Sequence, residues 1–412
     1  MASLGPLAAI LLYLAAARLV LKLLGGVPRH AAFALLNVAG FYWFFYHGSD
    51  ARYRPIFLLY LTLVLVLYLA MRIFSGRAGW QPWLAFAAPL LALVCVRYVP
   101  ASLFAQWSGG LKAVLWRNPD FAFSSCFFGL SYLAFRTSHL VLEIRNRVVP
   151  RPGFWEYLGY CFFLPTMSVG PINPFSNYRR AFDTAPPGIP AGRAALRVLV
   201  GLVKFQFLGT VFSQLGYSAL FLDGRLHHWV DFVVAVVFYY LFLYCNFSGF
   251  CDMAVGAAGL IGVPVAENFQ NPFAARNVKD FWNRWHITLS LYMRDVVFSP
   301  LSKFLVRLAG PANANHAIAL TILAVFLLVG VWHGVGWNYA AFGAAHALGV
   351  VVNHYYTLGL KKWLGRDGFK AYNSNRWIHA AAVAATFCYV AASLFFFANT
   401  FPEMKNILSS LR

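Results

Sequence analysis

Charged residues are scarce in this chain of 412 amino acids. Only 11% of the residues are charged and 60% are hydrophobic, whereas ordinary soluble domains carry about 25% charged residues. Several apolar runs reach the roughly 20 residues that a helix needs to cross a bilayer. A soluble fold could not bury this much apolar surface, so the composition predicts an all-α, polytopic membrane protein.

Acidic residues are scarcer still. The chain has 13 Asp and Glu against 33 Lys and Arg, a net charge of +20. Basic cytoplasmic loops, anionic lipid headgroups or an acidic partner would each account for this excess. The basic residues are scattered between apolar spans and form no compact soluble module, which argues against nucleic-acid binding. They occur on both kinds of loop, so the charge rule does not fix the membrane orientation.

Closely spaced cysteine pairs are absent. None of the six cysteines forms a CxxC pair, so neither a zinc site nor a thioredoxin-like motif is indicated, and we expect buried thiols that pack as small hydrophobes. All six fall in or beside apolar segments: Cys95, Cys126, Cys161, Cys245, Cys251 and Cys388. The first apolar run, about 7–24, lacks a basic leader and a clear cleavage site, so we expect a retained helix.

The apolar runs predict about 11 to 13 membrane helices. Prolines such as Pro82 and Pro89 predict that some helices are tilted, broken or re-entrant, which is tolerated where they pack on protein or line a wet cavity. The absence of internal repeats predicts a single integral domain over 1–412. The candidate spans are 7–24, 31–46, 55–74, 81–100, 121–140, 154–169, 195–222, 229–248, 251–263, 288–307, 316–332, 337–357 and 377–398.

Two polar stretches interrupt the apolar pattern. Turn residues in 171–193 predict a loop. The stretch 264–284 mixes prolines, polar residues and aromatics, and it predicts a loop followed by a short amphipathic helix at the membrane interface.

Two histidines stand in polar-aromatic signatures between apolar runs. His286 ends Phe-Trp-Asn-Arg-Trp-His, and His333 lies in Gly-Val-Trp-His-Gly. An ionisable group at membrane depth is functional by default, and histidine moves protons near neutral pH. The alternatives are an interfacial histidine anchored by Trp282 and Trp285, and a histidine bonded to a carbonyl at a helix end. If 278–290 is helical, His286 lies one turn from Trp282 and from Ser290.

Other polar residues lie between apolar runs. Asn246, Ser248 and Asp252 fall between 229–248 and 251–263, and an acid there is a proton relay or the structural partner of an arginine; we favour the partner. Arg294 and Asp295 are expected to form a structural ion pair. His346 is expected to pack or to support the site.

The order of several motifs resembles the membrane-bound O-acyltransferases (MBOAT). The resemblance is densest over about 240–350, with weaker echoes at 129–136 and 162–172, and it points to the bacterial branch of DltB-like D-alanyl transfer proteins and their alginate O-acetylase relatives. The motifs that carry it are Asn-Phe-Ser-Gly-Phe-Cys-Asp-Met (246–253), Glu-Asn-Phe-Gln-Asn-Pro-Phe (267–273), Asp-Phe-Trp-Asn-Arg-Trp-His-Ile-Thr-Leu-Ser (280–290), Arg-Asp (294–295) and Gly-Val-Trp-His-Gly (330–334).

This resemblance implies a fold with transmembrane, re-entrant and interfacial helices around a central funnel. It implies transfer of a D-alanyl or acetyl group from a cytoplasmic thioester to a hydroxyl of a cell-envelope polymer. His333 would be the general base, and His286 would orient the acceptor or stabilise the developing oxyanion. Candidate supporting residues are Asn283, Arg284, Trp285, Trp282, Ser290, Trp332, Asp252 and Asn246.

The resemblance also implies partners and a location. The donor would be a phosphopantetheine thioester on an acidic acyl carrier protein, or an acyl-CoA, with no tightly bound cofactor and no metal. Membrane lipids, the envelope polymer and a small membrane or periplasmic accessory protein would be partners, in a bacterial cytoplasmic (inner) membrane. A proton-coupled transporter is the alternative function, although transporters commonly contain repeats. A haem or metal protein ligated by both histidines is a third.

Overall fold

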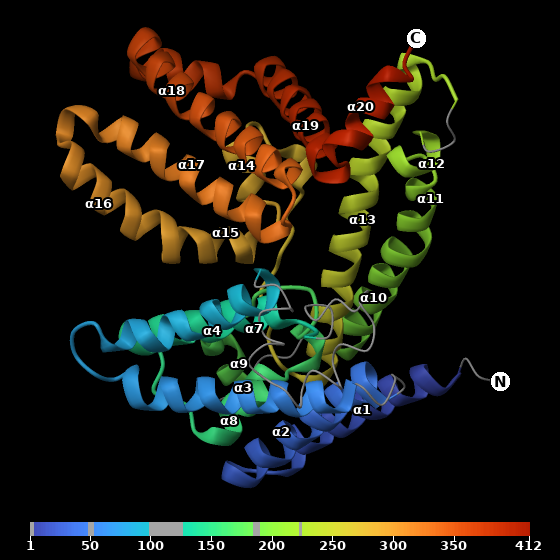
Figure 1. Cartoon of the computed structure of the whole chain (residues 1–412), viewed down its shortest axis with the longest axis vertical. Helices are drawn as coiled ribbons and strands as arrows, with labels where there is room; N and C mark the ends of the chain where they lie inside the picture. Colours follow the sequence, from blue (N-terminus) through green and yellow to red (C-terminus); the bar gives the residue numbers. More distant parts are fainter. Residues whose placement is uncertain (1–3, 48–52, 99–126, 184–189, 222–224) are drawn as a thin grey trace, which may run out of the picture. The chain divides into compact units, whose positions relative to one another are not determined.

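The computed structural model describes residues 4–47, 53–98, 127–183, 190–221 and 225–412 (Figure 1). Within these ranges the regular elements are helices, and strand-like pairing is confined to two isolated bridges, His227 with Leu411 and Phe269 with Trp285. The predicted all-α class is therefore confirmed. Cys126 and the first part of the predicted span 121–140 lie outside the described residues.

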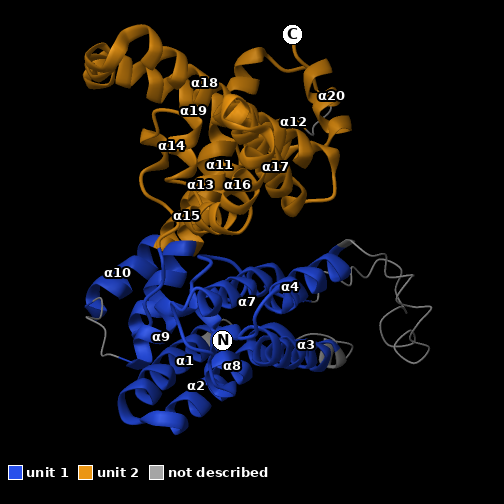
Figure 2. Cartoon of the chain, turned by 90° about the vertical axis from the view of Figure 1, so that its left-hand side faces the viewer, with its two compact units in different colours: residues 1–200, 251–266 blue, residues 201–250, 267–412 orange. Residues whose placement is uncertain are grey.

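The chain packs as two compact units, coloured separately in Figure 2. The first comprises 1–200 with 251–266, and the second comprises 201–250 with 267–412. The single-domain interpretation stays a prediction, because two packing units can serve one functional domain.

The helices that begin in the first unit are α1 (Leu4–Leu23), α2 (Gly26–Tyr42, continued by a π-helical turn Trp43–His47), α3 (Tyr53–Phe74), α4 (Gln81–Tyr98), α7 (Leu130–Arg145), α8 (Phe154–Cys161), a 3₁₀ turn (Leu164–Thr166), α9 (Phe175–Asp183) and α10 (Ala191–Leu202).

The later helices are a π-helical turn (Val203–Leu208), α11 (Gly209–Ser213), α12 (Tyr217–Phe221), α13 (Trp229–Ile261), a 3₁₀ turn (Pro272–Ala274), α14 (Val278–Trp282), α15 (Ile287–Met293), a π-helical turn (Arg294–Phe298), α16 (Ser299–Ala309), a 3₁₀ turn (Pro311–Asn313), α17 (Ala314–His333), α18 (Trp337–Ser374), α19 (Arg376–Ala398) and α20 (Phe401–Ser409).

Six helical segments of the described chain are long and apolar enough to cross a membrane: Gly5–Leu23, Ile56–Phe74, Ala191–Phe221, Trp229–Ile261, Pro311–His333 and Arg376–Ala398. This is fewer than the 11 to 13 predicted. The predicted span 154–169 ends as a helix after Cys161, and the predicted span 288–307 is interrupted by the π-helical turn. Short and broken helices among the apolar runs were expected, and they account for part of the difference.

Two local predictions are wrong. The predicted break between 229–248 and 251–263 is a continuous helix, α13, because Gly249 packs on backbone atoms of Gly201 and Phe205 and so does not end it. The predicted loop 171–193 contains α9, since Phe175, Tyr178 and Phe182 recur at helical spacing and bury one face. The stretch 264–284 does fold as loop and short helix.

Large apolar side chains point outward along the spanning helices. Leu12 is 70% exposed, Leu23 75% and Leu58 62%. Water would penalise such surfaces, whereas lipid tails are as apolar as leucine, so these faces fit a bilayer. The chain is a multi-pass membrane protein.

A buried arginine organises the core of the first unit. Arg136 is 1% exposed, and its Nη atoms donate to Thr166 Oγ1 at 3.1 Å and to the carbonyl of Cys161 at 2.9 Å. Its guanidinium also lies 5.3 Å from the ring centre of Tyr160. These contacts join α7 to the end of α8 and to the 3₁₀ turn that follows it. Breaking them would leave a buried charge without partners, which is energetically costly.

Helices α17 and α18 form a tight hairpin in the second unit, joined by Gly334, Val335 and Gly336. A Cβ atom at Gly330 would collide with the carbonyl oxygen of Tyr339, and one at Gly343 with that of Phe326. Glycine at these positions therefore allows the two backbones to touch. The hairpin fixes the end of α17, where His333 lies.

Candidate functional site

His286 lies at a sharp turn between two short helices. The condition that 278–290 forms one helix is not met: α14 ends at Trp282, and His286 has a left-handed φ of 45° before α15. A left-handed conformation is strained for a residue other than glycine, and such strain clusters at functional sites. The turn places His286 at the N-terminus of α15 rather than on the face shared with Trp282.

Backbone pairing holds the preceding loop beside this turn. Gln270 N–H donates to the Arg284 carbonyl at 2.9 Å, and Ile287 N–H donates to the Asn268 carbonyl at 3.0 Å. This pairing brings the side chain of Asn268 to His286, which is 18 residues away in the sequence.

The side-chain oxygen of Asn268 accepts three hydrogen bonds. The donors are His286 Nδ1 at 3.3 Å, Thr288 N at 3.1 Å and Thr288 Oγ1 at 2.7 Å. An amide oxygen can only accept, so the proton of the neutral His286 ring resides on Nδ1. Its Nε2 atom therefore presents a lone pair.

His286 Nε2 and Ser290 Oγ are buried polar atoms with no hydrogen-bond partner within the described ranges. Buried polar groups are normally satisfied, and each exception calls for an explanation. Both belong to the first turn of α15, where a substrate group could supply the partners. Ser290 lies one turn after His286, since its N–H donates to the His286 carbonyl at 3.1 Å.

Burial keeps the His286 imidazole neutral. The ring is 3% exposed. Burial, with a smaller contribution from the neighbouring charge of His333, lowers its pKa from the usual 6.5 to about 3. A neutral ring with an unprotonated Nε2 accepts a hydrogen bond there and does not donate one.

The structure brings His333 to the same place. The Trp332 ring centre lies 4.5 Å from that of His333 and 6.3 Å from that of His286. Phe397 and Phe342 pack edge-on against His333 at 5.0 Å and 5.9 Å between ring centres. His333 is half-buried, and it is the last residue of α17.

A second histidine network supports the site. Trp282 Nε1 donates to His346 Nδ1 at 3.2 Å, so the other ring nitrogen of neutral His346 carries the proton and donates to Ser393 Oγ at 3.0 Å. Ser393 in turn donates to the Val390 carbonyl at 2.7 Å. Trp282 and His346 are thus fully used in joining α14, α18 and α19, which matches the supporting role expected for His346.

Three other candidate residues lie close to His286 in the sequence, and the contacts described for them are with other residues. Arg284 Nε donates to Asp280 at 2.9 Å, and Asn283 is exposed at the end of α14. Trp285 is buried and stacks on Phe281 at 5.4 Å. These residues shape the turn that carries His286.

The polar residues of α13 have different surroundings. Asp252 forms an ion pair with Arg197 at 3.1 Å, which is the structural partnership favoured from the sequence. Asn246 is half-buried. Its neighbour Phe247 packs edge-on against the His286 ring at 4.7 Å. The expected Arg294–Asp295 ion pair is also present, at 2.8 Å.

Sequence reasoning missed Asn268, Phe247 and Phe397 as parts of the site. Asn268 stood out only as one of several polar residues in 264–284, and its partner became visible only when the loop was paired with the turn. No group of three or more His, Cys, Asp or Glu side chains suited to a metal ion occurs in the part of the chain that the structure describes.

Comparison with known proteins places the chain in a family. The sequence matches the membrane-bound O-acyltransferase family, MBOAT, over residues 49–397. It is 31% identical over 290 residues to the teichoic acid D-alanyltransferase of Streptococcus thermophilus, covering 66% of this chain and 68% of that protein.

More distant relatives have other acceptors in their names. The Helicobacter pylori peptidoglycan O-acetyltransferase is 28% identical, over 51% of this chain and 39% of that protein. The probable alginate O-acetylase AlgI of Azotobacter vinelandii is 24% identical, over 73% and 63%. With both histidines inside the matched region, the chain is an O-acyltransferase and belongs to the membrane-bound O-acyltransferase family.

Proposed function

We propose that the chain transfers an acyl group, D-alanyl in the first instance, from a thioester donor to a hydroxyl of a cell-envelope polymer. The observation that carries this proposal is the pair of imidazoles around Trp332, one with a buried lone pair and one at the end of a helix. Two relatives named as teichoic acid D-alanyltransferases support D-alanyl over acetyl, since they are 31% and 29% identical over about two thirds of their length, whereas the alginate O-acetylase matched over a similar share is 21% identical.

His286 orients the acceptor in this mechanism through a hydroxyl next to the one that attacks. This second hydroxyl would donate its hydrogen bond to Nε2, which Asn268 leaves unprotonated. Of the two roles that the family resemblance allowed, this geometry favours orienting the acceptor. Oxyanion stabilisation would need a donor, and a neutral ring protonated on Nδ1 offers none at Nε2.

His333 acts as the general base. The acceptor oxygen attacks the thioester carbonyl carbon while His333 takes the hydroxyl proton. The carbon–sulfur bond then breaks, and the departing sulfur receives that proton as a thiol. A positioned base is typically worth about 10²–10⁴ in rate.

The donor and the location belong to the same proposal. The donor is a phosphopantetheine thioester on an acidic carrier protein, for which the net charge of +20 is suited. Acyl-CoA is the competing donor. The site of action is the bacterial cytoplasmic membrane, where an accessory membrane or periplasmic protein would serve the far side.

The test uses the full-length protein in proteoliposomes with a radiolabelled D-alanyl carrier thioester and a polyol-phosphate acceptor. His333→Ala should lose at least about 100-fold in transfer. His286→Ala should raise KM for the acceptor more than it lowers kcat. His354→Ala is the matched control, because this partly exposed histidine hydrogen-bonds Asn315 and packs on Tyr355. Wild-type turnover by His333→Ala would overturn the assignment, as would proton flux without acyl transfer.

A further inference from the structure

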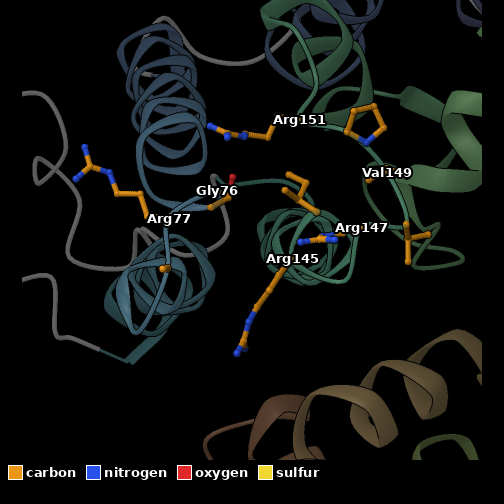
Figure 3. A pocket seen from close by; sticks show the side chains of 11 residues that line it. Gly76, Arg77, Arg145, Arg147, Val149 and Arg151 are labelled. Atoms are coloured by element: carbon orange, nitrogen blue, oxygen red, sulfur yellow. The ribbon is translucent and has the colours of Figure 1, made fainter.

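A cavity of about 630 Å³ lies in the first unit, between the loop after α3 and the loop after α7. Four of its eleven lining residues are arginines, and none is acidic. Figure 3 shows Arg77 from the first loop, Arg145 from the last turn of α7, and Arg147 and Arg151 from the second loop among the residues that line the cavity. So concentrated a positive charge is costly to assemble unless an anion compensates it.

A buried hydroxyl in the lining points to a ligand independently of the charge. Ser75 is 2% exposed, and its Oγ atom has no hydrogen-bond partner among the described residues. A buried hydroxyl without a partner costs about 1–3 kcal/mol. A phosphate oxygen in the cavity would accept its hydrogen bond.

Three guanidinium groups are held in place by the protein. Arg77 Nε donates to the Ile73 carbonyl at 3.2 Å, and Arg151 Nη1 donates to the Arg72 carbonyl at 3.4 Å. The Arg145 guanidinium lies 4.5 Å from the ring centre of Trp83. Each of these groups has five N–H donors, so these contacts orient the arginines and leave donors for an anion.

Arg147 breaks a local rule of helix ends. Its φ is 59°, and the Val148 N–H bonds the Glu143 carbonyl at 2.9 Å, which is the bonding of a helix end that usually carries glycine. An arginine there costs about 1 kcal/mol relative to glycine. The side chain at this lining position would repay that cost by binding an anion.

We propose that this cavity binds the phosphate of an anionic phospholipid headgroup. The spanning segment Ile56–Phe74 ends directly before Ser75, which sets the cavity at headgroup depth. Trp80 and Trp83 are 67% and 42% exposed, as tryptophans at a membrane surface are. A lipid also explains the mixed lining, since Ile144, Val148, Val149 and Pro150 would contact its glycerol and upper acyl carbons.

Native mass spectrometry of the full-length protein tests the proposal. Phosphatidylglycerol retention is compared with phosphatidylcholine retention in the wild type and in Arg77→Gln/Arg147→Gln. Removing two arginines near a membrane surface should weaken phosphatidylglycerol binding about 10- to 30-fold. The control is Lys303→Gln/Arg307→Gln, which removes the same charge from exposed positions on α16.

Two further variants test whether a loss of lipid binding could result from misfolding. Ser75→Ala should weaken phosphatidylglycerol retention by several-fold while leaving the melting temperature unchanged or raised, because it removes a hydroxyl with no protein partner. Arg147→Gly should weaken retention and preserve or raise the melting temperature, because it relieves the left-handed strain.

The outcomes separate the sources of the phosphate. Loss of phosphatidylglycerol preference in the cavity variants but not in the α16 control supports the proposal. Equal loss in both double variants would make the preference a bulk charge effect and overturn it. Saturation by submillimolar inorganic phosphate, without preference between the two lipids, would assign the cavity to a soluble phosphate and overturn the lipid source.

Discussion

Asn268 should govern both the stability and the proton chemistry of the site. Asn268→Ala removes the oxygen that accepts from His286 Nδ1 and from both donors of Thr288. A net hydrogen bond is worth about 1 kcal/mol, so losing three should lower the free energy of unfolding by about 3 kcal/mol. Losing the bond that fixes the His286 proton on Nδ1 should also lower kcat/KM about 10-fold.

The measurement is a denaturant titration of the detergent-solubilised full chain, with transfer assayed in parallel. Asn373→Ala is the matched control, because this exposed asparagine only bonds the Phe369 carbonyl in its own helix. It should stay within about 0.5 kcal/mol of the wild type. If the free energy of unfolding of Asn268→Ala also stayed within about 0.5 kcal/mol of the wild type, the reasoning would be refuted.

A conservative variant separates positioning from mere support. Asn268→Asp keeps the three acceptor bonds and adds a negative charge beside His286, which raises its pKa from about 3. A protonated Nε2 cannot accept the acceptor hydroxyl, so the acid limb of kcat/KM should move to higher pH. An unchanged pH profile at wild-type stability would show that Asn268 only braces the loop.

Three other changes have defined outcomes. The folded state holds His286 neutral with a pKa near 3, whereas the unfolded ring takes a proton near 6.5; stability should therefore fall as the pH drops below about 6.5, by about 2 kcal/mol at pH 5. His286→Gln should remove this share of the dependence in denaturant titrations at several pH values, whereas the share from His346, whose pKa burial also lowers to about 3, should remain. Gly330→Ala should lower the melting temperature by several degrees, because its methyl group meets a backbone carbonyl of α18, whereas Gly359→Ala, with open space around it, should be neutral or stabilising. Asp252→Asn should cost about 1 kcal/mol through its ion pair with Arg197 and leave transfer intact, and loss of transfer at full stability would identify a proton relay instead.

The sequence motifs were a better guide to which residues lie together than to where the helices begin and end. Because functional side chains sit in distinctive polar-aromatic strings, the sequence identified His286 and His333 as a pair. It could not show that a left-handed turn at His286 separates α14 from α15, since backbone conformation there depends on pairing with a distant loop.

The long apolar helices of the described residues are fewer than the apolar runs in the sequence for a related reason. Apolar runs such as 154–169 are buried against protein in the first unit, where an apolar side chain looks the same in sequence as one that faces lipid. The polar residues within α13 led to a different error, the prediction of a break where the helix continues. Its glycine serves close packing on another backbone and leaves the helix unbroken.

The contact between α17 and α18 has a consequence for motion. Gly330 and Gly343 bring main chain against main chain, so no side chain between them can change rotamer to make room. His333 can therefore shift by more than its own rotamer only if the whole hairpin separates. Amide hydrogen exchange along this contact should follow one cooperative opening event, and its rate would set how often the histidine leaves its working position.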